Sequence, residues 1–151
     1  MGQSRYQANG FIPINEPPAR RTMTAAAVTI VKGDILHDNG AGLATNATVS
    51  FDSATCLGVA AADCASGEVC EYYPIDSKTQ YIVPVAADAL ITQTVVGTNI
   101  DMEANDDVDV SDAVTTGLGF RVDEIDVSAA AIAANTYGYA IGHFVTVVTE
   151  S

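Results

Sequence analysis

The chain has no tryptophan, only four phenylalanines and only six basic residues among its 151. Its hydrophobic fraction is nonetheless 48%, and alanine and valine supply most of it. That fraction excludes a chain that is disordered throughout, and the length is sufficient for a domain with a core. Because large apolar residues are scarce, we expect a core assembled from small side chains.

Long apolar runs are also absent. No stretch approaches the roughly 18 apolar residues that a membrane-spanning helix needs. The first nine residues are polar and no signal-peptide core follows them. We therefore expect a protein made in the cytoplasm, with no membrane partner.

Cysteines are few, and Cys56, Cys64 and Cys70 lie close together in the sequence. An odd number in one short stretch is a poor disulfide framework, and the spacing matches no zinc motif. The pattern predicts reduced thiols, no metal and no cofactor.

Half of the six basic residues lie within the first 21 positions of the chain. Residues 1–31 hold three arginines and one glutamate, a net charge of +2, whereas residues 32–151 hold three basic and eighteen acidic residues, a net charge of −15. Such an acidic body repels nucleic acid and anionic lipid. We expect no nucleic-acid partner.

Residues 1–24 are predicted to form an extended N-terminal arm. Pro13, Pro17 and Pro18 disfavour helix and keep the preceding residues extended. A frayed terminus and a docking arm both fit this pattern. Aromatic and arginine side chains are typical interface anchors, and a docking arm that can be deleted without unfolding the body would bind a partner through Arg5, Tyr6, Phe11, Ile12, Pro13, Arg20 and Arg21.

Residues 25–151 are predicted to form an all-β body of short antiparallel strands. Candidate strands recur every 8–12 residues or so, separated by Gly, Asn and Asp, which indicates a small barrel or sandwich. The body is either one domain or two small lobes, 25–85 and 86–151, that meet near Pro84–Asp88. Ser128–Asn135 is a candidate helical segment, and Tyr139–Val148 is the clearest strand, with Gly142 at a bulge or close approach.

The order of motifs in Val28–Ile75 resembles the head decoration proteins, or capsid cement proteins, of tailed phages. The elements that carry the resemblance are Lys32-Gly33-Asp34-Ile35, Asn39–Ala44, Leu57-Gly58-Val59-Ala60 and Ser66-Gly67-Glu68-Val69. The segments Tyr81–Glu103 and Gly138–Val145 are similar to a second lobe and closing strand of some phage head proteins.

The resemblance implies a structural function. Members of this family are β-rich, often trimeric, and coat the outer capsid surface at junctions between major capsid subunits, where many dock an N-terminal arm. The implied partners are the major capsid protein and further copies of the chain, with a trimer favoured. The implied location is the outer surface of the virion.

One acidic segment has the spacing of a calcium-binding loop. Its oxygen ligands would be Asp101, Glu103, Asn105, Asp107, Asp109 and Asp112. Asp106 stands where such a loop needs glycine, and flanking helices are not expected. A solvated acidic loop is the alternative, and it is the one we favour.

No combination of residues predicts an enzyme. His37 and His143 lack a nucleophile motif nearby and are expected at the surface or at strand edges. Acidic residues alternate with apolar ones over residues 122–127, which indicates a half-buried strand. The alternative function is a carbohydrate- or host-surface-binding β module, whose aromatic platform would come from Tyr72, Tyr73, Tyr81, Tyr137 and Tyr139.

Overall fold

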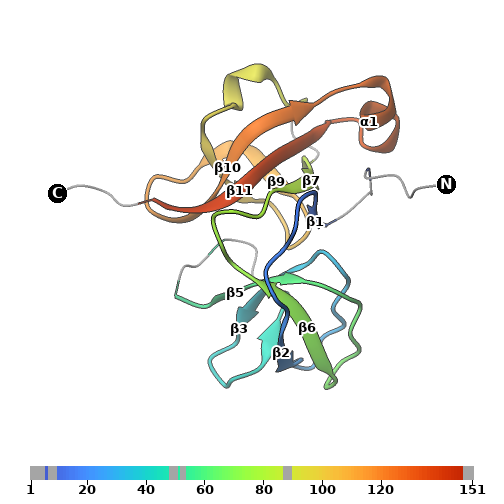
Figure 1. Ribbon diagram of the computed structural model, residues 1–151, viewed down its shortest axis with the longest axis vertical. Helices are drawn as coiled ribbons and strands as arrows, with labels where there is room; N and C mark the ends of the chain where they lie inside the picture. The colour runs from blue at the N-terminus through green and yellow to red at the C-terminus, as the bar shows by residue number, and fades with distance from the viewer. Residues whose placement is uncertain (1–5, 7–9, 48–50, 52–53, 87–89, 148–151) are drawn as a thin grey trace.

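The computed structural model describes residues 6, 10–47, 51, 54–86 and 90–147. Within them the chain forms two antiparallel sheets that lie one above the other along the long axis of the molecule (Figure 1). Neither sheet closes into a barrel. The predicted all-β class is therefore confirmed, in a sandwich-like form.

Sheet A is the larger of the two. Its six strands lie in the order β1-β7-β11-β10-β8-β9. They are β1 (Ile12–Pro13), β7 (Tyr81–Pro84), β8 (Asn99–Met102), β9 (Val108–Ala113), β10 (Gly117–Asp126) and β11 (Tyr139–Val147).

The long hairpin of β10 and β11 is the centre of sheet A. Its register shifts between Val122 and Glu124, opposite Gly142. A Cβ atom on Gly142 would lie 1.9 Å from the carbonyl oxygen of Arg121. The prediction of a bulge or close approach at this glycine is confirmed, because only a residue without a side chain fits there.

Sheet B has five strands in the order β2-β6-β5-β3-β4. They are β2 (Arg21–Thr24), β3 (Ile35–Asp38), β4 (Ala44–Thr45), β5 (Cys56–Ala60) and β6 (Val69–Pro74). A single bridge between Ala25 and Ala44 brings the ends of β2 and β4 together without closing the sheet.

Helical structure is short. A 3-10 turn, η1 (Gln93–Val95), precedes β8, and α1 (Ala129–Ala134) connects β10 to β11. The Ser128 hydroxyl accepts a hydrogen bond from the N–H of Ala131 and so caps α1. This helix lies inside the segment predicted to be helical.

One hydrophobic core joins the two sheets. Ile35 and Val59 of sheet B belong to the same buried cluster as Phe120 and Phe144 of sheet A. The chain passes from sheet B to sheet A over residues 75–80, ahead of the boundary that the sequence suggested near Pro84–Asp88. The sheets are thus packed against each other and not merely tethered.

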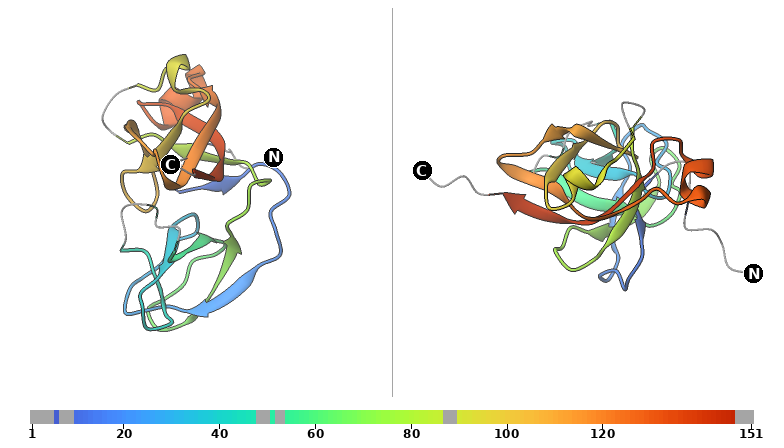
Figure 2. Two further views of the ribbon diagram at one scale, coloured as in Figure 1. Left: turned by 90° about the vertical axis from the view of Figure 1, so that its left-hand side faces the viewer. Right: turned by 90° about the horizontal axis from the view of Figure 1, so that it is seen from above.

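The N-terminal segment is extended, as predicted, but it is not a separate arm. Its β1 pairs with β7 in sheet A, and its β2 pairs with β6 in sheet B. The segment crosses between the sheets (Figure 2). It runs beside residues 75–80, where the Ile14 N–H donates to the Gln80 carbonyl at 2.9 Å. Composition alone did not show that this segment supplies one edge strand to each sheet.

Phe11 lies at the centre of the shared core with an exposed fraction of 1%. Its ring centroid lies 5.5 Å from that of Phe120, 5.7 Å from Phe144 and 6.4 Å from both Phe51 and Tyr81. Aromatic rings at these separations add to the free energy gained by burial. Many of the large aromatic side chains of the protein therefore pack around one N-terminal residue.

Two glycines let the N-terminal segment enter this core. Gly10 and Gly33 have φ values of +98° and +95°, and a Cβ atom on Gly33 would lie 2.9 Å from the Cα atom of Gly10. The Phe11 N–H donates to the Gly33 carbonyl at 2.9 Å, and the Gly10 N–H donates to the Asp106 carbonyl at 2.8 Å. The segment is thereby bonded to both halves of the molecule.

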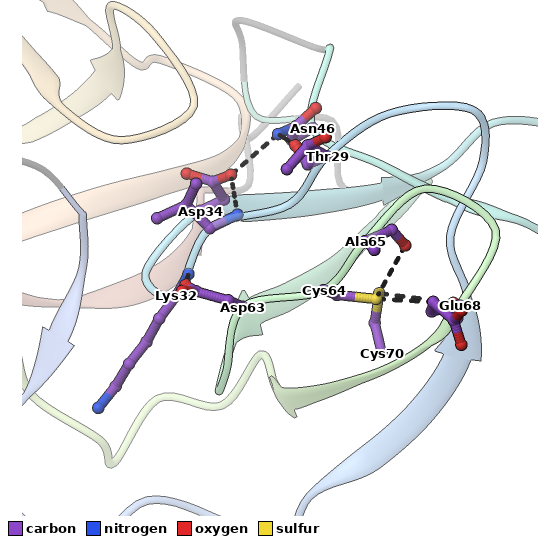
Figure 3. Close-up of a disulfide and its surroundings, with 10 residues drawn as sticks. Thr29, Lys32, Asp34, Asn46, Asp63, Cys64, Ala65, Glu68 and Cys70 are labelled. Carbon is purple, nitrogen blue, oxygen red and sulfur yellow. Dashed lines mark hydrogen bonds between the residues drawn. A yellow bond between two sulfur atoms is a disulfide. The ribbon is translucent and has the colours of Figure 1, made fainter.

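The prediction that all three cysteines are reduced is wrong. Cys64 and Cys70 form a disulfide across the tip of the β5–β6 hairpin (Figure 3). Their Cα atoms are 5.6 Å apart, because the hairpin folds back on itself between them. Cys56 is not part of a disulfide. An odd count does not exclude one local pair.

Replacing Phe11 with alanine should destabilise the protein by about 3–5 kcal/mol, because it removes a fully buried ring and leaves a cavity. Ile14→Ala is the control, since Ile14 is 37% exposed. Chemical denaturation measures both variants. A loss of less than about 1 kcal/mol for Phe11→Ala would contradict the central position of this ring. For the same reason we expect deletion of residues 1–21 to unfold the body, not to leave it folded.

Reducing the disulfide should lower the free energy of unfolding by about 2 kcal/mol, because the bond closes a short loop in the unfolded chain. Denaturation midpoints with and without dithiothreitol measure the effect. The double variant Cys64→Ser, Cys70→Ser should match the reduced protein and lose its sensitivity to the reductant. A wild-type midpoint unchanged by reduction would show that the bond contributes nothing.

Candidate interaction surface

The structure separates the seven residues predicted to dock on a partner. Phe11 is buried in the core, whereas Ile12 and Pro13 form β1 and are half-buried. Arg20 and Arg21 are exposed. Arg5 lies outside the described residues, and Tyr6 is treated next. Of the described members, then, only the two arginines have exposed side chains that a partner could contact.

Tyr6 is held against sheet A. Its ring centroid lies 5.2 Å from that of Tyr139, and its hydroxyl donates to the carboxylate of Asp126. The hydroxyl also lies 3.3 Å from the Ser128 hydroxyl at the start of α1. Tyr6 thus anchors the chain to its own body, a contact that its aromatic character alone did not reveal.

The two arginines stand at an edge of sheet B. Strand β2 is the last strand of that sheet and pairs with β6 on one side only. Its side chains are exposed except for Met23, which packs on the smaller core cluster. At the end of β2 its outer side meets β4, where Ala25 forms a parallel bridge with Ala44 and the Ala26 N–H donates to the Ala44 carbonyl at 2.8 Å. The result is a short edge with positive charge on a strongly acidic protein.

Arg20 is held in place by neighbours on β6. Its guanidinium donates to the Glu71 carboxylate at 2.6 Å and to the Tyr73 hydroxyl at 3.4 Å, and its central carbon lies 5.5 Å from the centroid of the Tyr73 ring. These hydrogen bonds raise the pKa of Arg20. The ion pair is about half exposed, so it orients the side chain more than it stabilises the fold.

Sequence reasoning missed Glu71 and Tyr73 as parts of this surface. Both lie on β6, whose neighbour β2 was assigned to the arm. Glu71 is the one charged residue of β6, between Cys70 and Tyr72, and that charge was a visible signal that it faces solvent. No pattern in the sequence indicated which residue would lie across from it.

The residues of the predicted calcium loop form the turn and flanks of the β8–β9 hairpin. Several of their polar groups bond to protein instead: Asp101 accepts from the N–H groups of Phe51 and Met102, and the Asn105 amide donates to the Asn46 carbonyl. No three His, Cys, Asp or Glu residues in the described ranges form a group that could hold a metal ion. The oxygens do not converge because a hairpin spreads them along two strands.

The two histidines differ in their surroundings. His37 is buried with an exposed fraction of 1%, so its expected place at the surface or a strand edge is wrong. His143 is partly exposed, and its Nδ1 lies 2.8 Å from the Asp123 carboxylate. Asp123 also accepts a hydrogen bond from the Gln80 amide at 3.1 Å, so the pair links β10 and β11 to the start of β7.

Asp34 is a buried carboxylate at the junction of the two sheets. It accepts hydrogen bonds from the Val31 N–H and the Asn46 amide, both at 2.9 Å (Figure 3). Burial raises the pKa of Asp34, and repulsion from Asp106 adds to the shift. Burial likewise raises the pKa values of Asp106 and Asp107 in the β8–β9 turn. The charged form of each is therefore less favourable in the folded state than in water.

The chain matches no known family model, and no curated protein matches it either. Among the described residues, no helix is long and apolar enough to cross a membrane.

The raised pKa values predict that mild acid stabilises the protein through these aspartates. As the pH falls, a carboxyl whose pKa is higher in the folded state is protonated in the folded protein before it is protonated in the unfolded chain. Its charged form therefore destabilises the fold at neutral pH, and this destabilisation is relieved as the pH falls through the folded pKa. Asp106→Asn should therefore raise the thermal midpoint at pH 7, and its advantage should vanish near pH 4.

The exposed Asp112→Asn is the matched control, since it removes the same charge outside any buried environment. Thermal unfolding followed by circular dichroism at several pH values measures both variants. An equal gain for both would assign the effect to net charge, and no gain for Asp106→Asn would contradict the role of burial.

Proposed function

We propose that this chain is a structural protein of a phage head, which binds the outer surface of the capsid and bridges neighbouring major capsid subunits. The observation that carries the proposal is the exposed pair Arg20 and Arg21 at the start of the edge strand β2, on a body whose net charge is otherwise strongly negative. Such an arrangement fits a protein that is soluble alone and attaches to another protein by one face.

The resemblance of Val28–Ile75 to head decoration proteins supports the same function. Its motif residues occupy structural positions: Gly33 contacts Gly10, Asp34 is buried, and Val59 and Ala60 belong to the cores. These residues therefore support a common architecture and not a binding site. The partner-binding residues must lie elsewhere, and the edge at β2 is the candidate.

The docking mode differs from that expected for a free arm. An arm that orders on its partner loses about 1–2 kcal/mol per residue in backbone entropy. Residues 10–24 are already ordered on this body, so docking would not require that ordering. If copies linked as an oligomer occupied many equivalent sites, their weak contacts would together give firm attachment.

The alternative, a carbohydrate- or host-surface-binding module, needs exposed aromatic side chains. Tyr72, Tyr73, Tyr81 and Tyr139 are all buried, with exposed fractions of 8% or less. Tyr137 is half-buried and packs against the larger core. No observation favours this function over the first.

The proposed function predicts saturable binding to shells assembled from the major capsid protein of the same genome. Purified protein should sediment with undecorated shells and raise the temperature at which they break open, because it adds contacts between subunits. An unrelated acidic protein of similar size is the control. Absence of sedimentation, or binding that leaves the disruption temperature unchanged, would contradict the proposal.

A further inference from the structure

We propose that Asn39 is a site of self-catalysed deamidation, for which the turn between β3 and β4 supplies both a base and hydrogen-bond donors. The backbone nitrogen of Gly40 attacks the side-chain amide of Asn39, which ends as aspartate or isoaspartate. The reaction needs no partner protein, so its outcome is independent of the proposed function and of the experiment with shells.

The nucleophile belongs to an exposed glycine. Residues 39–42 are all exposed. Gly40 has a φ of +90°, and apart from its chain neighbours no described residue lies within 4 Å of the position that a Cβ atom would take. A side chain here would obstruct the approach of the nitrogen to the neighbouring amide, whereas glycine leaves the approach open. Ring closure between Asn39 and Gly40 therefore meets little steric resistance.

Asp38 is bonded to the proton that must leave this nitrogen. Its Oδ1 atom accepts the Gly40 N–H at 2.8 Å and the Gly42 N–H at 3.2 Å. A peptide nitrogen becomes a nucleophile only when it loses its proton, and a carboxylate within hydrogen-bond distance of that proton has the position of a general base. Asp38 is held there because it is the last residue of β3, where it pairs with Ala44.

Two backbone donors converge on the oxygen that becomes negatively charged. Asn39 Oδ1 accepts the Ala41 N–H at 2.8 Å and the Leu43 N–H at 3.3 Å. The Asn39 N–H donates in return to the Leu43 carbonyl at 2.9 Å, which closes the turn. Two N–H groups on one carbonyl oxygen stabilise a tetrahedral intermediate in the manner of an oxyanion hole. They also fix the amide in one place beside the nucleophile.

The reaction conserves atoms and needs only solvent water as a co-reactant. The Gly40 nitrogen gives its proton to Asp38 and forms a bond to Cγ of Asn39, while the electron pair of the carbonyl moves onto Oδ1. When the carbonyl re-forms, the bond from Cγ to Nδ2 breaks, and Nδ2 leaves as ammonia with the proton that Asp38 held. The resulting succinimide ring is opened by water at either carbonyl, which gives aspartate or isoaspartate.

The chain contains a second Asn-Gly pair, Asn9 and Gly10, in which the glycine has other surroundings. The Gly10 N–H donates to the main-chain carbonyl of Asp106 at 2.8 Å, and Gly10 is buried against Gly33. A carbonyl oxygen does not take a proton from an amide as a carboxylate base does. Asn9 itself lies outside the described residues. Because both pairs consist of the same two residue types, they form an internal comparison.

Conversion of Asn39 should alter one end of sheet B. Isoaspartate lengthens the main chain of the turn by a methylene group, and either product adds a negative charge. The turn sets the pairing of His37 with Thr45 between β3 and β4, and the Ala26 N–H donates to the Ala44 carbonyl of β4 at 2.8 Å. We therefore expect the amide signal of Ala26 to move as isoaspartate accumulates, while the β10–β11 hairpin keeps its signals.

The test follows deamidation in the full chain during storage at neutral pH. Trypsin cuts after lysine and arginine and so places the two pairs in separate peptides, 6–20 and 33–78, in which mass spectrometry with fragmentation locates each conversion. The folded protein should convert Asn39 at least about tenfold faster than Asn9, which is below the full contribution of a positioned base. In denaturant the two rates should become similar. Absence of conversion at Asn39, or equal rates in the folded protein, would overturn the inference.

A variant of the base separates catalysis from turn geometry. Asp38→Ser keeps an oxygen that accepts the Gly40 N–H but removes the carboxylate, and it should slow conversion at Asn39 by at least about tenfold. Asp76→Ser is the matched control and should leave the rate unchanged, because Asp76 accepts two backbone N–H groups in a similar turn of the same peptide. Faster conversion in Asp38→Ser would show that the hydrogen bond restrains the nitrogen, and it would also overturn the inference.

The pH profile tests the role of Asp38 without a variant. In the unfolded chain the base is hydroxide, so the rate of conversion should rise in proportion to the hydroxide concentration. In the folded protein the carboxylate is the base, so the rise should be much shallower. Circular dichroism shows whether Asp38→Ser remains folded, and the pH profile decides between the two bases where that variant unfolds. A folded-state profile as steep as that of the unfolded chain would exclude Asp38 as the base.

Discussion

The position of Phe11 in the shared core is the interaction on which the rest of the structure depends. Its ring is surrounded by aromatic side chains from distant parts of the sequence, among them Phe120 and Phe144, and its backbone is bonded to Gly33. Gly10, one residue earlier, is bonded to the β8–β9 turn. Because the two sheets share one core around this ring, the N-terminal segment acts as an internal connector between them.

This constraint explains why a segment with the composition of a tail is ordered. Residues 10–24 bury one large aromatic side chain and add an edge strand to each sheet. The free energy of burying Phe11 and of pairing two short strands offsets the entropy lost by the backbone. Once the segment is fixed in this way, its exposed residues include Ile14, Asn15, Glu16 and the two arginines at the start of β2.

The acidic surface and the basic edge together define how the protein would meet a partner. The high negative charge of the body disfavours approach to an acidic partner by any other face. The β2 edge is locally different because Arg20 and Arg21 lie on opposite faces of the strand.

The sequence by itself determined the all-β class, the helical turn after Ser128 and the close approach at Gly142. Each of these follows from local preferences: β-branched runs between turn residues, a serine cap before alanines, and a glycine within a strand. The charge division between the first 31 residues and the rest was also readable directly. None of these features requires knowledge of which segments lie side by side.

Only the tertiary structure decided where Phe11 goes, that Cys64 bonds to Cys70, that His37 is buried and that the acidic loop opens into a hairpin. The physical reason is the same in each case. Composition indicates whether a side chain prefers water or the interior, but its burial and pairing depend on neighbours distant in sequence. Arg20, for example, is oriented by Glu71, which lies 51 positions later in the chain. The candidate surface was therefore only partly predictable: its charge could be read from the sequence, and its place at the start of an edge strand came from the fold.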